Sequence, residues 1–249
     1  MSTAGNIDYR NPFPENMDRR TIVAAIAMAV ALPVMAASRA RKMTSTVTST
    51  MRYLTFLPKS YSAKGPRLPL ILFLHGSGER GTDLEKVKAW GPPALADKDP
   101  DFAFIVVSPQ LAEGEAWHAL ALKGLLDQVL AKYHVDRRRV YLTGLSLGGY
   151  GAWDLASRYP EYFAAVAPIC GGGIARSVGS MRAIPTWVFH GKKDDAVPEE
   201  ESARMVAALQ AAGGDVRYTV LPEGGHVDAW VHAYDKAGLF DWFLQNTKK

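Results

Sequence analysis

The chain has 249 residues, of which 48% are hydrophobic, and its 29 Lys and Arg against 25 Asp and Glu give a net charge of +4. This length suffices for one sizeable domain with a buried core, and so mild a charge does not indicate nucleic-acid binding. The single cysteine, Cys170, excludes an intrachain disulfide.

The N-terminal residues have the pattern of a targeting segment. Arg19 and Arg20 precede an Ala-rich apolar run over 22–35, and small residues follow it, so a signal peptide is expected over about 17–38. We therefore expect a targeting segment and linker over 1–43, a folded domain over 44–249, and export to the periplasm or the medium. The paired arginines leave the twin-arginine route open, and an uncleaved anchor helix is the alternative. After cleavage, no stable membrane partner is expected.

Short apolar runs alternate with segments of helical spacing along the rest of the chain. The expected strands cover 47–56, 68–74, 104–107, 140–143, 164–169, 186–189 and 216–221. The expected helices cover 83–90, 120–133, 149–159, 199–212 and 228–245, the first of them capped by Asp83 and broken by the glycine and prolines at 91–93. This alternation predicts an α/β fold in one domain, with a mostly parallel sheet, helices on both faces and no large lid.

The motif Gly144-Leu-Ser-Leu-Gly148 is the most informative feature of the chain. An apolar strand precedes it and an amphipathic helix follows it, as a nucleophile elbow requires. In such an elbow a sharp turn exposes one hydroxyl at the top of the sheet, so Ser146 is predicted to be a nucleophile.

A serine hydroxyl needs a base within hydrogen-bond distance and a carboxylate that orients the base. In this type of fold the acid follows a late strand and the histidine follows the last strand. Two of the six histidines follow the last expected strand, and only His226 lies in the loop, because His232 lies within the last expected helix. Asp194 and Asp195 both follow the strand over 186–189, and the residues alone do not choose between them. His75 and His190, which precede glycines at strand ends, are expected to be structural.

An oxyanion hole needs two backbone N–H groups that point at the developing negative charge. One is expected from Leu147, directly after the nucleophile. The other is expected from Ser77, in the glycine-rich loop 75–81 after an early buried strand. That loop lacks the Gly-Lys-Ser/Thr ending of a phosphate-binding loop.

No metal and no cofactor are expected. The sequence has no His-Glu-x-x-His motif, no cysteine pair and no cluster of histidines and carboxylates at ligand spacing. Cys170, before three glycines, is expected to be a small buried residue at a strand end rather than a nucleophile.

Several of these segments together resemble the α/β-hydrolase superfamily, in the branch of the phospholipase/carboxylesterase and dienelactone-hydrolase-like families that includes exported esterases and predicted peptidases. The resemblance covers about residue 48 to the C-terminus. It is carried by the segments 74–81, 108–110, 135–151, 168–173 and 187–191.

The resemblance implies a catalytic serine at Ser146, a histidine at His226 and, as the fifth residue of a His-Gly-x-x-Asp pattern, the acid at Asp194. It also implies the oxyanion donors Ser77 and Leu147. The chain departs from the family pattern after the histidine, where Val227 is inserted before the following Asp-Ala-Trp.

These observations predict an exported serine carboxylesterase whose partner is a small-molecule or polysaccharide-linked ester. Trp117, Tyr150 and Trp230 are expected either to line a cleft suited to feruloyl or acetyl esters or to belong to the core and rim. A peptidase of the prolyl-oligopeptidase type is the second hypothesis, although no propeller domain is present to gate peptides. A non-catalytic binding module on a hydrolase scaffold is the third, and the presence of all three triad residues weighs against it.

Overall fold

The computed structural model describes residues 50–248, so the predicted targeting segment and linker at 1–43 lie outside the described residues. A seven-stranded sheet forms the centre of the described part. Its strands are β1 (Arg52–Phe56), β2 (Leu68–Leu74), β3 (Ile105–Gln110), β4 (Val135–Leu145), β5 (Ala165–Ile169), β6 (Thr186–Gly191) and β7 (Val216–Leu221).

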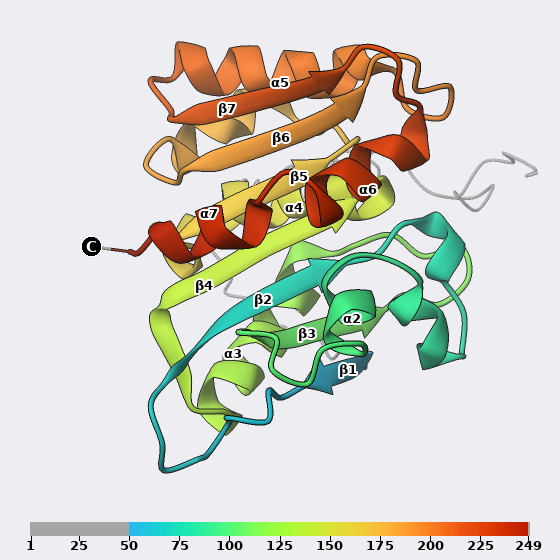
Figure 1. The fold of residues 1–249 in the computed structure, drawn as a ribbon. Helices are drawn as coiled ribbons and strands as arrows, with labels where there is room; N and C mark the ends of the chain where they lie inside the picture. Colours follow the sequence, from blue (N-terminus) through green and yellow to red (C-terminus); the bar gives the residue numbers. More distant parts are fainter. Residues whose placement is uncertain (1–49, 249) are drawn as a thin grey trace, which may run out of the picture. The chain divides into compact units, whose positions relative to one another are not determined.

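The strand order is β1-β3-β2-β4-β5-β6-β7, with β1 antiparallel to β3 and every other pairing parallel (Figure 1). The central strands are continuous apolar runs because helices cover both of their faces. This confirms the predicted mostly parallel sheet.

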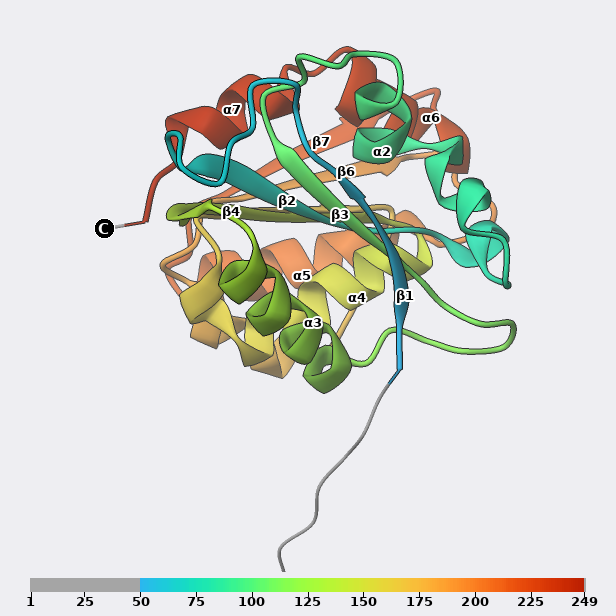
Figure 2. The same cartoon turned by 90° about the horizontal axis from the view of Figure 1, so that it is seen from below.

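Six α-helices are described: α2 (Gly91–Ala96), α3 (Ala119–Lys132), α4 (Leu147–Arg158), α5 (Glu199–Ala211), α6 (His226–Asp235) and α7 (Leu239–Gln245). Helices α3, α4 and α5 cover one face of the sheet, and α2, α6 and α7 cover the other (Figure 2). Short 3₁₀ helices lie in the connections, namely η1 (Ser77–Glu79), η2 (Leu84–Ala89), η3 (Pro160–Tyr162) and η4 (Ala175–Met181).

Two predicted helices are wrong in detail. The single helix predicted over 228–245 is two helices, because Gly238 takes a left-handed conformation with φ of 71° between α6 and α7. The glycine and prolines at 91–93 do not only break a helix. They begin α2, since proline fits the first turn, where its missing N–H needs no partner. Asp83 caps η2 as predicted, accepting from the Glu85 N–H.

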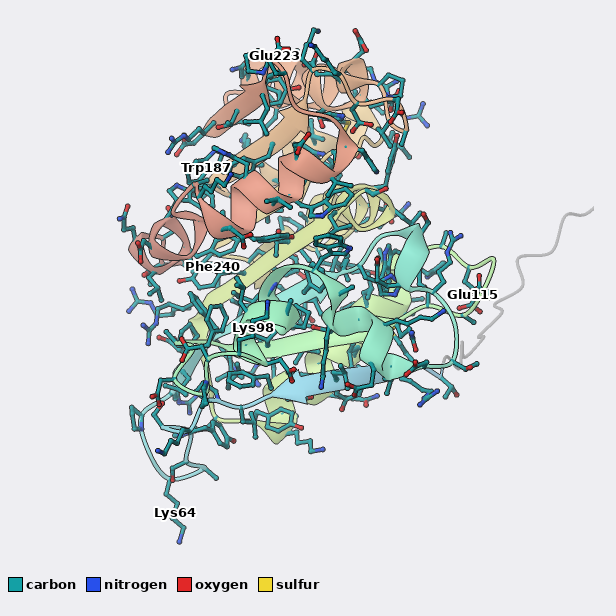
Figure 3. The ribbon with its side chains drawn as sticks, turned by 45° about the vertical axis from the view of Figure 1, so that its right-hand side comes forward. Lys64, Lys98, Glu115, Trp187, Glu223 and Phe240 are labelled. Carbon is teal, nitrogen blue, oxygen red and sulfur yellow. The ribbon has the colours of Figure 1, made fainter. Side chains whose placement is uncertain are left out.

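Aromatic side chains fill much of the space between the sheet and helix α7. The Phe240 ring packs edge-on against Phe102 with centroids 5.1 Å apart, and Trp187 packs edge-on against Trp242 at 5.4 Å (Figure 3). This layer attaches helix α7 to the sheet. Among the described residues, no helix is long and apolar enough to cross a membrane.

Candidate active site

The candidate active site lies at the carboxyl ends of the parallel strands, where loops from distant parts of the chain meet. Ser146 directly follows β4, Asp194 lies in the loop after β6, and His226 follows the loop after β7 (Figure 1). Strands β4, β6 and β7 are parallel and lie in the same half of the sheet, with β5 between β4 and β6, so one edge gathers all three side chains.

The turn that carries Ser146 is strained. Ser146 has φ of 54° and ψ of −118°, outside the regions that non-glycine residues ordinarily occupy. A Cβ on Gly144 would lie 2.4 Å from the Gly148 carbonyl oxygen, and a Cβ on Gly148 would lie 1.9 Å from the Leu74 carbonyl oxygen. Both glycines are therefore required by backbone crowding. The Ser146 N–H donates to the Ile169 carbonyl at 2.9 Å and ties the turn to β5.

The three predicted triad side chains form a hydrogen-bonded line. The Ser146 Oγ lies 2.9 Å from His226 Nε2, and His226 Nδ1 lies 2.5 Å from Asp194 Oδ2. The His226 side chain is 16% exposed while that of Asp194 is fully buried. The exposed end of the line is therefore the serine and histidine end, where a substrate could enter.

Of the two aspartates, the structure brings Asp194 to the histidine, while Asp195 is exposed. The other carboxylate oxygen of Asp194 accepts from the backbone N–H groups of Ala196 and Val197 at 3.0 and 2.8 Å. These bonds fold the loop around the carboxylate and turn its second oxygen toward His226.

Two helix starts lie around Ser146. Leu147 begins α4 and Ser77 begins η1, and the first N–H groups of a helix have no acceptor within it. The loop before Ser77 packs against the end of β4, directly before Ser146, since a Cβ on Gly76 would lie 2.8 Å from the Leu145 side chain. The structure thus places both predicted oxyanion donors at helix starts on adjoining turns.

Trp117 lies behind this loop, with only 9% of its surface exposed. Its indole N–H donates to the His75 carbonyl at 3.2 Å, and its ring packs on the His75 imidazole at 4.8 Å between centroids. A Cβ on Gly151 would lie 2.8 Å from it. Of the two alternatives for Trp117, this placement favours the core over the cleft, because the ring packs behind the loop and offers little surface to a substrate.

The other two predicted substrate contacts lie closer to the triad. Trp230 packs edge-on against His226 with ring centroids 5.0 Å apart. Tyr150, partly exposed on the first turn of α4, lies beside Gly172, whose Cβ would be 3.2 Å from the tyrosine ring. The sequence did not point to Trp90, which is 37% exposed and packs on Trp230 at 5.9 Å. In the sequence Trp90 is only a tryptophan before a glycine, and this pattern is not specific for a binding site.

One cluster has donor atoms close enough to hold a metal ion. The ligand atoms of Cys170, Asp194 and His226 lie within 4.8 Å of one another. Burial raises the pKa of the Cys170 thiol, whereas a metal ligand must be a thiolate. Asp194 and His226 are already bonded to each other. The donor set therefore suits a hydrogen-bonded triad better than a metal centre.

A parallel sheet with a serine elbow, a late acid and a last-loop histidine defines an α/β-hydrolase. Comparison with known proteins agrees: residues 108–211 match the esterase PHB depolymerase family, and residues 176–249 match the prolyl oligopeptidase family. The chain belongs to the α/β-hydrolase superfamily.

Three similar proteins are esterases. The bifunctional acetylxylan esterase/xylanase of Neocallimastix patriciarum is 30% identical over 139 residues, or 53% of this chain and 20% of that protein. Feruloyl esterase B of Neurospora crassa is 29% identical over 150 residues, or 54% of this chain and 49% of that protein. The crystal structure of a thermostable esterase superposes with a TM-score of 0.71 at 33% identity, covering 80% of this chain and 60% of that one. The chain thus spans less than two thirds of each.

Proposed function

We propose that this protein is a serine carboxylesterase that works through an acyl-enzyme. The observation that carries the proposal is the line from Ser146 Oγ to His226 Nε2 at 2.9 Å and from His226 Nδ1 to Asp194 Oδ2 at 2.5 Å. A serine held in this way can pass its proton to the imidazole while it attacks a carbonyl carbon.

The chemistry then follows from the groups present. Ser146 Oγ attacks the ester carbonyl, and the developing oxyanion is met by the backbone N–H groups of Leu147 and Ser77. His226 gives its proton to the leaving alcohol, which leaves Ser146 acylated. Water attacks the acyl carbon while His226 takes its proton. The bond from that carbon to Ser146 Oγ then breaks, His226 returns the proton to Oγ, and the acid leaves. Asp194 stays ionised and holds the imidazole in its orientation.

For the substrate, we propose acetyl, feruloyl or similar small acyl esters, including esters on polysaccharides. The names of the similar acetylxylan and feruloyl esterases support this class. Trp90, which is 37% exposed, supports it as well, because it packs on Trp230 and Trp230 packs on His226. His226 protonates the leaving alcohol, so an aromatic surface on this side would lie along a ring-shaped alcohol or an aromatic group. We further propose that the protein acts after export, as the pattern over 17–38 suggests.

The proposal is tested by hydrolysis of p-nitrophenyl esters of increasing chain length with the full-length protein. We expect activity that is highest on short acyl chains and falls beyond about four carbons. Ser146→Ala should lower kcat by at least ~10⁴-fold, because the residual rate would come from the oxyanion hole and binding alone. Gly124→Ala, on helix α3 with open space around its Cβ, is the matched control and should leave kcat unchanged. Full activity in Ser146→Ala would refute the assignment.

The match of residues 176–249 to the prolyl oligopeptidase family favours a peptidase as a second candidate. A fluorophosphonate probe labels any activated serine, so labelling of Ser146 without ester hydrolysis would direct the search to peptide substrates. Absence of both labelling and hydrolysis would indicate a non-catalytic binding module.

A further inference from the structure

His190, the residue before the end of β6, is a fully buried histidine beside the acid of the candidate triad. Its Nε2 lies 3.2 Å from Asp194 Oδ2 and 2.9 Å from the Val197 carbonyl oxygen, and its Nδ1 lies 2.7 Å from Ser202 Oγ. The mechanism described above does not use it. Both ring nitrogens nevertheless have polar partners, and one of these is the atom that orients His226.

The Asp194 carboxylate is buried and surrounded by donors. One oxygen accepts from the Ala196 and Val197 N–H groups. The other is bonded to His226 Nδ1 and lies 3.2 Å from His190 Nε2, whose hydrogen bond is to the Val197 carbonyl of the same loop. A buried carboxylate is stable only when donors fill its lone pairs, and bonds to an ionised group are the stronger ones. Without His190, only His226 would direct the second oxygen.

A second residue holds His190 in place. The Ser202 hydroxyl, fully buried on α5, lies 2.7 Å from His190 Nδ1 and donates to the Gly171 carbonyl at 2.9 Å. Gly171 in turn packs on the start of α4, because a Cβ there would lie 2.7 Å from the backbone of Gly149. One chain of buried contacts therefore joins the acid loop to the helix that follows Ser146.

We propose that His190 is a positioning residue which, held by Ser202, fixes the Asp194 carboxylate for its hydrogen bond to His226. The inference rests on the proposed serine esterase function. Neither His190 nor Ser202 touches the reacting atoms, since both side chains are fully buried. The contribution of His190 is made by Nε2, which bonds the Val197 carbonyl of the acid loop and lies 3.2 Å from the Asp194 oxygen that also faces the catalytic imidazole.

Two amide substitutions separate positioning from packing. In His190→Gln the side-chain amide reaches the place of Nε2 and can still donate to the Val197 carbonyl beside Asp194. In His190→Asn it reaches only the place of Nδ1 and faces Ser202. Thr186→Val is the control, because it removes another buried hydrogen bond of the same strand, from Thr186 Oγ1 to the Ile184 carbonyl.

We expect His190→Asn to lower kcat on a short p-nitrophenyl ester by ~10- to 100-fold with KM nearly unchanged, since the bond to Val197 and the contact with the Asp194 carboxylate are both lost. His190→Gln should keep kcat within about threefold of wild type on the same principle, and Thr186→Val should lower stability alone. The downfield NMR resonance of the His226 Nδ1 proton should shift in His190→Asn and persist in His190→Gln.

Equal kcat and an unchanged His226 resonance in both amide variants would overturn the inference, as would equal damage in both. If His190→Asn does not fold, Ser202→Ala removes the support of Nδ1, and an unchanged kcat and resonance in that folded variant would overturn it too. The resonance needs no substrate, so it tests the positioning of Asp194 even if the wild-type protein hydrolyses no ester. Absence of ester hydrolysis in the wild-type protein would refute the proposed function and leave the positioning of Asp194 to be decided by the resonance.

Discussion

At the scale of single residues, Gly148 links the elbow to the oxyanion loop. An added Cβ would lie 1.9 Å from the Leu74 carbonyl oxygen and 2.8 Å from that of His75, so backbone must move. We expect Gly148→Ala to lower the free energy of unfolding by about 1–3 kcal/mol. It should also lower kcat, because the loop that carries Ser77 shifts. Urea unfolding and ester hydrolysis measure the two effects.

The control for Gly148→Ala is Gly124→Ala, where nothing lies within 4 Å of the added Cβ inside helix α3. Alanine is the better helix former, so this change should raise the free energy of unfolding by about 0.5–1 kcal/mol. If both substitutions had the same effect, crowding at Gly148 would not explain the motif.

Single residues were predictable where a motif constrains geometry. A strand, a turn and a chain order select Ser146 and His226, and the structure brings these two side chains within 2.9 Å of each other. Asp194 and Asp195 are consecutive residues of one loop, and the sequence does not show which of the two side chains faces His226. The spacing in the family pattern was therefore needed to prefer Asp194. The sequence left Trp117 undecided between cleft and core, because it does not show that the indole N–H is bonded to the His75 carbonyl.

At the scale of elements, the connection from β2 to η1 depends on a neutral histidine. His75 Nδ1 lies 2.5 Å from the Gly76 carbonyl, and Nε2 accepts from the Leu111 N–H at 3.1 Å, so Nδ1 carries the proton. Burial lowers the pKa of His75 from its ordinary 6.5. Protonation would break the bond from Leu111 and loosen the oxyanion loop.

The lowered pKa of His75 makes the free energy of unfolding depend on pH. As pH falls below about 6.5, the unfolded chain binds a proton at His75 that the folded protein refuses, so the free energy of unfolding decreases. His75→Gln does not titrate. We therefore expect the stability advantage of wild type over His75→Gln to narrow between pH 7 and pH 5 in urea unfolding. Burial raises the pKa of the neighbouring Glu79, which is present in both proteins. A constant difference over this range would contradict the assigned protonation state.

Elements were predictable where apolar periodicity was long and uninterrupted. Strands β2 and β7 have the predicted bounds, and helices α3 and α5 begin and end within one residue of them. The predicted helix bounds were wrong at glycine and proline, because either residue can end or begin a helix according to its position. Gly238 allowed a left-handed break that periodicity hides, and the prolines at 92–93 could either stop or start a helix.

For the described part as a whole, the candidate triad and helix α7 lie at opposite ends of the strands (Figure 1). Helix α6 begins with His226 at the carboxyl ends of the strands, and α7 lies toward the ends where the strands begin (Figure 1). Strand order was not predictable in detail, since periodicity says which segments are strands but not which ones pair. That the catalytic loops would meet was predictable, because parallel strands share one carboxyl edge.

Helix α7 therefore allows packing to be changed far from the candidate triad. Phe243 in α7 is fully buried and stacks on Tyr141 with centroids 4.9 Å apart, while its neighbour Leu244 is 36% exposed. We expect Phe243→Ala to lower the free energy of unfolding by about 3–5 kcal/mol, because a large cavity opens beneath the sheet. Leu244→Ala should change it by less than about 0.5 kcal/mol. Under conditions where both variants are folded, kcat should equal that of wild type, because neither side chain contacts the loops that carry the triad. A fall in kcat for folded Phe243→Ala would show that α7 also sets the position of His226, through α6.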